Sequence, residues 1–206
     1  MKTSKIKICG ITNIDDAVKI VELGVDYVGM IINVPFSPRS IDKIMAVEIS
    51  AAAKRASSSV KVVGVFVNES LTDAREAIDF CHLDVAQLHG NESPAYCSAL
   101  RDAVEVWKAV VVNSRRDVEM SEKYRASADM VVFDAGYGNG LSIDFSLLTG
   151  VEVDVLAGGL GLSNIVDAIR KIKPDVVDIN TAVESAPGVK DINLVKSIIN
   201  KINKDI

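Results

Sequence analysis

The chain has 206 residues, of which 49% are hydrophobic and 25% charged, and its net charge at pH 7 is −5. The mean hydropathy of +0.25 excludes a disordered or fibrous protein, and the acidic balance argues against nucleic-acid binding, which needs a basic face. No apolar run approaches the roughly 18 residues of a membrane-spanning helix, and the first residues lack the apolar stretch of a signal peptide. We therefore expect a cytoplasmic protein that does not enter a membrane.

Eight apolar, strand-like runs recur along the chain, and an amphipathic helical pattern follows each of them. The strand-like runs cover residues 5–9, 27–32, 60–67, 84–89, 104–112, 129–134, 153–157 and 176–180. The helical patterns, with apolar side chains every three or four positions, cover residues 15–23, 41–56, 71–81, 93–103, 116–127, 143–148, 164–172 and 191–202.

The repeated strand-then-helix unit predicts the fold class. Nearly continuous apolar strands are typical of parallel strands that are buried on both faces. Eight such units predict a compact (β/α)₈ TIM barrel, formed as a single domain over residues 1–206. The alternative is a doubly wound open sheet, which usually has fewer strands and would leave two units over.

Cysteine and histidine are too few and too scattered for a structural metal site. The three cysteines have no CxxC spacing, and there are only two histidines. A disulfide framework or a zinc cluster is therefore not expected, and we predict a protein without a metal.

Candidate acid–base groups stand where two strands end, and TIM barrels place their active sites at the carboxyl ends of the strands. Strand alternation directs Lys7 and Cys9 into the barrel. Cys9 is either a small buried hydrophobe or a reactive thiol whose pKa the following helix lowers. Asp134 closes an apolar strand, where a carboxylate is costly unless it is partnered or functional; the alternative is a cap for the next turn.

Other polar residues at strand ends are candidate binding groups. Gln87 and His89 share the inward face of the fourth run, although a lone histidine is more often structural. Arg39 follows the second run in a loop that two prolines make rigid, and it suits a carboxylate unless it is simply solvated. We also expect the buried Lys7 to pair with Asp178 on the neighbouring last strand and to bias Cys9 towards the thiolate.

Two loops have the composition of a phosphate site. Gly158 and Gly159 follow the seventh run, and Thr181 follows the eighth. Glycine N–H groups and a short helix start at these two places are where barrel enzymes bind phosphate. Neutral donors of this kind allow an acidic chain to bind an anion. The GxGxG segment at 136–140 does not support a dinucleotide site, because no long helix follows it.

Taken together, these motifs resemble the phosphoribosylanthranilate isomerases of tryptophan biosynthesis over nearly the whole chain. The matching segments are KICGIT (7–12), SPR (37–39), VGVFVN (63–68), QLHG (87–90), Asp134, LAGGL (156–160) and DINTAVESAPGVKD (178–191).

The resemblance implies a cofactor-free (β/α)₈ barrel that carries out an Amadori rearrangement of a small phosphorylated substrate. It assigns Cys9 as general base, Asp134 as general acid, Arg39 to the anthranilate carboxylate, and Gly158 and Gly159 to the phosphate. Further candidate binding residues are His89 in the QLHG motif and, in the segment 178–191, Asp178, Asn180 and Thr181.

The sequence departs from the family pattern at two loops. Asn139 stands where the family has threonine, and Ala182 stands where it commonly has glycine. Because alanine lacks glycine's freedom at positive φ, the phosphate loop is expected to differ slightly. The alternatives are another phosphosugar isomerase or epimerase on the same barrel, and a non-catalytic barrel that binds a phosphorylated ligand.

Overall fold

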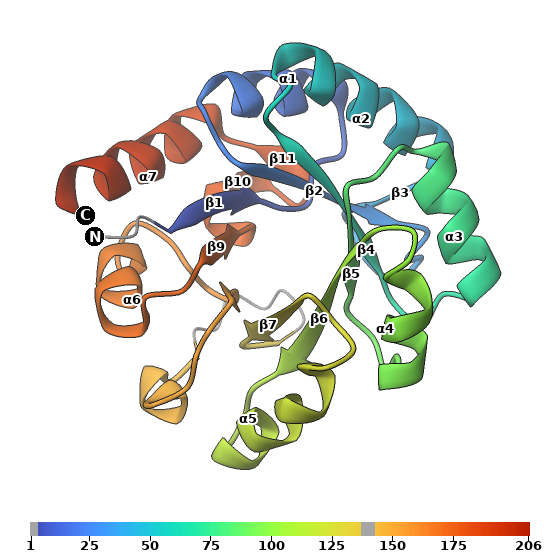
Figure 1. Cartoon of the computed structure of the whole chain (residues 1–206). Helices are drawn as coiled ribbons and strands as arrows, with labels where there is room; N and C mark the ends of the chain where they lie inside the picture. Colours follow the sequence, from blue (N-terminus) through green and yellow to red (C-terminus); the bar gives the residue numbers. More distant parts are fainter. Residues whose placement is uncertain (1–3, 137–142) are drawn as a thin grey trace.

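Parallel strands close into a barrel in the computed structural model, which describes residues 4–136 and 143–206 (Figure 1). Its strands are β1 (Lys5–Ile8), β2 (Tyr27–Ile32), β4 (Lys61–Phe66), β5 (Val85–Leu88), β6 (Glu105–Val111), β7 (Met130–Asp134), β8 (Val155–Leu156) and β9 (Val176–Ile179). Because β1 pairs with β9 as well as with β2, the sheet has no free edge within the ring. The predicted TIM barrel is confirmed, and the open doubly wound sheet is wrong.

Helices surround the strands on the outside of the ring (Figure 1). They are α1 (Ile14–Glu22), α2 (Lys43–Ala56), α3 (Leu71–Phe80), α4 (Pro94–Leu100), α5 (Arg115–Ser121), α6 (Ile165–Ile172) and α7 (Ile192–Asp205). Short polar side chains accept backbone N–H bonds at several of their first turns, which explains where these helices begin. The capping residues of this kind are Asn13, Asp42, Ser70, Ser93 and Asp191.

The structure differs from the predicted elements where segments are too short to show a period. The helical pattern at 143–148 forms a single 3₁₀ turn, η2 (Phe145–Leu148). A second 3₁₀ turn, η1 (Glu122–Tyr124), extends α5. A two-residue strand, β3 (Ser40–Ile41), pairs with the end of β2. After β9 the chain forms the 3₁₀ turn η3 (Thr181–Val183) and then a small antiparallel hairpin, β10 (Glu184–Ala186) with β11 (Val189–Lys190).

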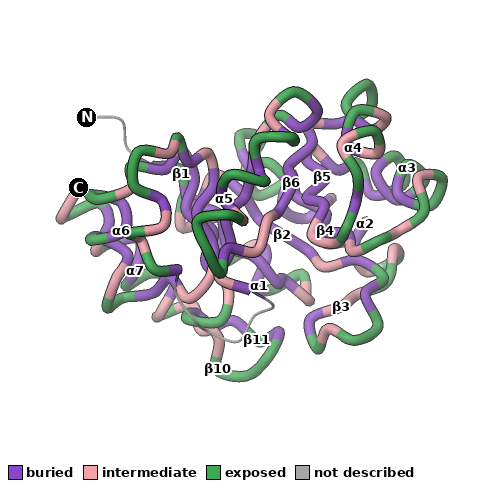
Figure 2. The backbone as a smooth tube through the Cα atoms, turned by 90° about the horizontal axis from the view of Figure 1, so that it is seen from below, coloured by how far each residue is buried: buried purple, intermediate pink, exposed green. Residues whose placement is uncertain are grey.

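Two layers of apolar side chains fill the protein, and the strands between them are almost entirely buried (Figure 2). The outer layer lies between strands and helices. The inner layer fills the barrel and contains Tyr27 and Trp107, whose rings meet edge to face with centroids 5.0 Å apart. These side chains fill the barrel interior, so that a site can form only beyond them, at the carboxyl ends of the strands.

Replacing Trp107 with alanine should lower the free energy of unfolding by about 3–5 kcal/mol, because the fully buried indole leaves a cavity inside the barrel. Met120→Ala is the matched control, since Met120 is half exposed and should cost under about 1 kcal/mol. Urea unfolding monitored by circular dichroism measures both. An equal loss of unfolding free energy in the two variants would show that Trp107 is not part of a close-packed barrel interior.

Candidate active site

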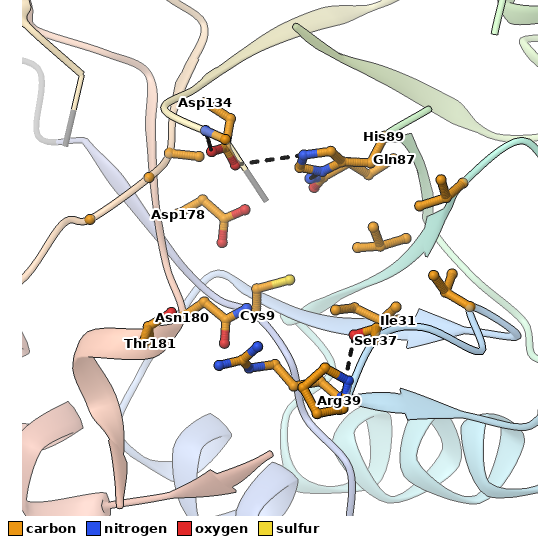
Figure 3. A pocket seen from close by; sticks show the side chains of 18 of the residues that line it. Cys9, Ile31, Ser37, Arg39, Gln87, His89, Asp134, Asp178, Asn180 and Thr181 are labelled. Atoms are coloured by element: carbon orange, nitrogen blue, oxygen red, sulfur yellow. Dashed lines mark hydrogen bonds and ion pairs between the residues drawn. The ribbon is translucent and has the colours of Figure 1, made fainter. Parts of the chain in front are cut away.

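One cavity of about 340 Å³ opens at the carboxyl ends of the barrel strands (Figure 3). The structure brings every residue predicted for the site to its wall: Cys9, Arg39, His89, Asp134, Gly158, Gly159, Asp178, Asn180 and Thr181. Apolar side chains form the rest of the lining, and Ile31, Val34, Val65 and Val67 are among them. The wall of the cavity therefore combines polar and apolar side chains.

Cys9 and Asp134 open into this cavity from different strands. Cys9 follows β1 directly, and Asp134 is the last residue of β7. Figure 3 shows the thiol and the carboxyl group on facing parts of the wall, with Asp178 between them. The two groups are far apart in the sequence, and only closure of the barrel places them at the same cavity.

The environment of Asp134 favours its neutral, protonated form. Burial raises the pKa of this carboxyl group. His89 and a hydrogen bond from the Gly136 N–H both lower it, but by less than burial raises it. His89 Nε2 lies 3.7 Å from Asp134 Oδ2, and burial lowers the pKa of the imidazole. A protonated carboxylic acid beside a neutral imidazole can donate a proton to a substrate.

The lowered thiol pKa expected for Cys9 is wrong. Burial raises the pKa of Cys9, and the attraction of the Lys7 ammonium opposes this only in part. The helix expected to lower this pKa begins at Ile14, five residues after Cys9, and the electrostatic effect of a helix end fades within a turn. Cys9 is therefore a thiol whose ionisation depends on a nearby cation.

Lys7 provides that cation, and the predicted Lys7–Asp178 contact is confirmed. Lys7 Nζ lies 2.6 Å from Asp178 Oδ2, and Lys7 is fully buried. A methyl group added to Gly29 would lie 2.9 Å from Cys9 Sγ and 3.1 Å from Lys7 Nζ. Gly29 therefore leaves the space in which the thiol and the ammonium approach each other. The second oxygen, Asp178 Oδ1, is buried without a hydrogen-bond partner among the described residues.

Arg39 lines the cavity but is not solvated, because it already has a partner. Its guanidinium donates from Nε and Nη2 to the carboxylate of Glu184, with distances of 2.7–3.1 Å. Lys190 donates to the same carboxylate at 2.8 Å. Glu184 and Lys190 were not predicted, although both belong to the motif at 178–191, because neither directly follows one of the eight strand-like runs.

The glycines predicted to bind phosphate have the backbone that such a loop requires. Gly158 and Gly159 adopt φ values of +85° and +60°, in the region that side chains disfavour. A Cβ on Gly158 would lie 2.5 Å from the Ala135 N atom. Thr181 begins η3 on the adjoining strand end. Ala182 lies within the same turn and is not among the positive-φ residues, so glycine's freedom is not required there. Asn139 lies outside the described residues.

A second buried pair supports the loop after β5. Lys108 Nζ lies 3.2 Å from Glu92 and donates to the carbonyl groups of Leu88 and Gly90, while Glu92 accepts from the Gly90 N–H. This pair fixes the backbone on both sides of His89.

In the described residues no group of three or more His, Cys, Asp or Glu side chains could hold a metal ion. Likewise, none of the helices in that part of the chain is long and apolar enough to cross a membrane.

Comparison with known proteins decides the family. The family model described as N-(5'phosphoribosyl)anthranilate (PRA) isomerase matches residues 6–201. The chain belongs to this family. A relative from Pelobacter propionicus is 37% identical over 201 residues, which cover 95% of this chain and 93% of the relative. A relative from Myxococcus xanthus is 38% identical and covers 95% and 94%. Both are named N-(5'-phosphoribosyl)anthranilate isomerase.

Solved structures agree with this assignment. The phosphoribosyl anthranilate isomerase of Thermotoga maritima superimposes with a TM-score of 0.88 at 34% identity, covering 99% of this chain and all of that one. Another phosphoribosyl anthranilate isomerase, solved with reduced 1-(o-carboxyphenylamino)-1-deoxyribulose 5-phosphate, gives a TM-score of 0.87 at 34% identity, covering 98% of this chain and 100% of that one. The fold and the family therefore point to the same enzyme class.

The ionisation of Cys9 should respond in opposite directions to its two charged neighbours. Because burial raises the pKa of the thiol, iodoacetamide should label Cys9 only above the usual pH range of cysteine. Lys7→Met should move the midpoint to still higher pH by removing the cation. Asp178→Asn should move it to lower pH by removing the anion.

Site-resolved mass spectrometry measures this labelling, and N-acetylcysteine in the same solution is the reference thiol, because Cys81 and Cys97 are themselves buried. A midpoint below that of ordinary cysteine, or shifts of equal sign in the two variants, would contradict the assigned electrostatics.

Proposed function

We propose that this chain converts N-(5-phospho-β-D-ribosyl)anthranilate to 1-(2-carboxyphenylamino)-1-deoxy-D-ribulose 5-phosphate in tryptophan biosynthesis, with Cys9 and Asp134 as its base and acid. Membership of the isomerase family gives the reaction. The single observation that supports the roles is that these two side chains open into one cavity. The reaction is an intramolecular redox change, so the protein has only to move protons.

Asp134 acts first, as the general acid. Its carboxyl proton passes to the ring oxygen of the ribose while the C1′–O bond breaks, and the amine lone pair forms the C=N bond of a Schiff base. The raised pKa of Asp134 lets it hold that proton to a higher pH than an ordinary aspartate does. His89, 3.7 Å away, takes part in substrate binding beside the acid and positions it.

Cys9 then removes the proton from C2′. The C2′–H electrons form a C1′=C2′ bond while the C=N electrons return to the nitrogen, which turns the Schiff base into an enolamine. The enolamine takes up a proton at C1′ as its C2′ hydroxyl loses one, and the aminoketose results. The thiol has to ionise before it can act as a base. The Lys7 ammonium and the developing positive charge of the protonated Schiff base both favour the thiolate. The substrate thus helps to create the base that acts on it.

The two ends of the substrate match the polar and the apolar side chains of the cavity wall. We assign the phosphate to the backbone around Gly158, Gly159 and Thr181, together with Asn180, because loops with these dihedrals and helix starts bind anions. We assign the carboxylate to Arg39 and the aromatic ring to the apolar lining. Asp178 Oδ1, which has no described partner, suits a hydroxyl group of the sugar.

The rival functions lack a supporting feature. A metal-dependent epimerase needs a cluster of ligands, and the described residues contain none. A non-catalytic barrel would bind phosphate without needing an acid and a thiol at the same cavity. We further propose that the enzyme works as a single domain in the cytoplasm, on a phosphorylated small molecule.

Cys9→Ala and Asp134→Asn should each lower kcat by at least about 10²-fold with little change in KM, because each removes one proton-transfer group and no main binding contact. The decay of anthranilate-type fluorescence after mixing with freshly prepared substrate measures the rate.

Cys97→Ala is the matched control, because Cys97 is equally buried but lies in α4 and away from the cavity. It should retain nearly full turnover. Near-normal turnover in Cys9→Ala or Asp134→Asn would overturn the assigned roles, and absence of turnover in the unmodified protein would overturn the proposed function.

A further inference from the structure

Arg39 belongs to a buried cluster of three charged side chains, which we call the Arg39 cluster: Arg39, Glu184 and Lys190. Their side chains are 10%, 4% and 0% exposed. Glu184 accepts from Arg39 Nε and Nη2, and Lys190 Nζ donates to Glu184 Oε1 at 2.8 Å. Two cations thus share one anion, and the cluster keeps a net positive charge beside the cavity.

Glu184 binds Arg39 without lining the cavity itself. The described residues that line the cavity include Arg39 but not Glu184. The pairing uses Nε and Nη2 and leaves Nη1 outside it. Figure 3 shows the guanidinium group reaching towards Asn180 and Cys9 at the cavity wall. A bidentate pair fixes the plane of a guanidinium, which a single hydrogen bond would leave free to rotate.

The carboxylate of Glu184 is itself fixed by contacts that do not involve Arg39. The Gly188 N–H donates to Glu184 Oε1 across the β10–β11 hairpin at 3.2 Å. Thr12 Oγ1 donates to the Gly188 carbonyl at 2.5 Å, and the Lys190 N–H donates to Asp16 Oδ2 at 3.1 Å. The hairpin is thereby attached to the loop between β1 and α1 and to the first turn of α1. Glu184 therefore has a set position before any ligand arrives.

Burial alone would raise the pKa of Glu184, but the hydrogen bonds from Arg39 and Lys190 outweigh it, so that the pKa is lowered. The carboxylate accordingly stays ionised across neutral pH and keeps its hold on the guanidinium. An arginine that is already immobilised loses less conformational entropy when a ligand binds to it.

We propose that Glu184 is the positioning residue for recognition of the substrate carboxylate: it orients Arg39 so that the aryl carboxylate meets a fixed, net positive guanidinium. The inference rests on the proposed function, since it takes the ligand of Arg39 to be the anthranilate end of the substrate. It gives Glu184 a part in specificity, because a ligand without that carboxylate gains nothing from the oriented Arg39.

The test compares two ligands on two proteins. The first ligand is reduced 1-(o-carboxyphenylamino)-1-deoxyribulose 5-phosphate, and the second is the same molecule without the ring carboxyl group. On the unmodified protein the carboxylate should tighten binding by about tenfold or more, as a charge-assisted hydrogen bond does. In Glu184→Gln the ratio of the two dissociation constants should fall below about threefold, while the ligand lacking the carboxyl group binds as before.

Turnover gives a second readout. Glu184→Gln should raise KM and leave kcat within a few-fold, because the lost contact serves binding and not proton transfer. Glu184→Asp keeps the charge on a shorter side chain and should retain a larger share of the preference for the ligand with the carboxyl group. This variant also provides a test if Glu184→Gln folds poorly.

Glu92→Gln is the matched control. Glu92 is also a buried glutamate paired with a lysine, but it lies under the loop after β5. It should lose stability while the ratio of the two ligands stays that of the unmodified protein. An unchanged ratio in Glu184→Gln would overturn the inference. So would a larger ratio, because Glu184 would then compete with the ligand for Arg39. Neither result would affect the turnover of the unmodified protein, which tests the proposed function separately.

Discussion

The ion pair between Lys7 and Asp178 joins the first strand of the barrel to the last, and the site depends on this junction. The two residues are register partners of β1 and β9, and their charged atoms lie 2.6 Å apart in the buried interior. Removing either partner would leave an uncompensated buried charge, which is strongly destabilising. The same closure carries Cys9, two residues after Lys7, to the wall opposite Asp134. Structural integrity and catalytic geometry therefore share one set of contacts.

Burial of charge recurs at three places around the cavity, and each place serves a different purpose. Lys7 and Asp178 set the charge next to the thiol. Burial raises the pKa of Asp134, as its proposed role as an acid requires. The Arg39 cluster holds the guanidinium that we propose binds the substrate carboxylate. Because desolvation disfavours the charged form of a group, the protein can hold one carboxyl group neutral and another ionised within a single cavity. A protein with a net charge of −5 can thus offer local positive charge to the phosphate and the carboxylate of the proposed substrate.

The sequence predicted the architecture well, because regular alternation of apolar strands and amphipathic helices is a long-range signal that survives small errors at each boundary. It also predicted which residues would line one cavity, since polar residues at strand ends must gather at one end of a barrel. It missed the partner of Arg39, because the β10–β11 hairpin is too short to have a period and its contacts span 145 positions along the chain. It gave the wrong sign for the pKa of Cys9, because the depth of a side chain depends on three-dimensional packing.

We propose that Cys9 and Asp134 act on opposite sides of one sugar held at the open end of the barrel. A crystal structure of this protein with the reduced product analogue bound tests this arrangement. We expect Cys9 Sγ in contact with C2′ and an oxygen of Asp134 within hydrogen-bond reach, about 3 Å, of the former ring oxygen. The arrangement is wrong if the ligand occupies the same cavity and either side chain points away from the sugar, with neither a direct contact nor a bridging water.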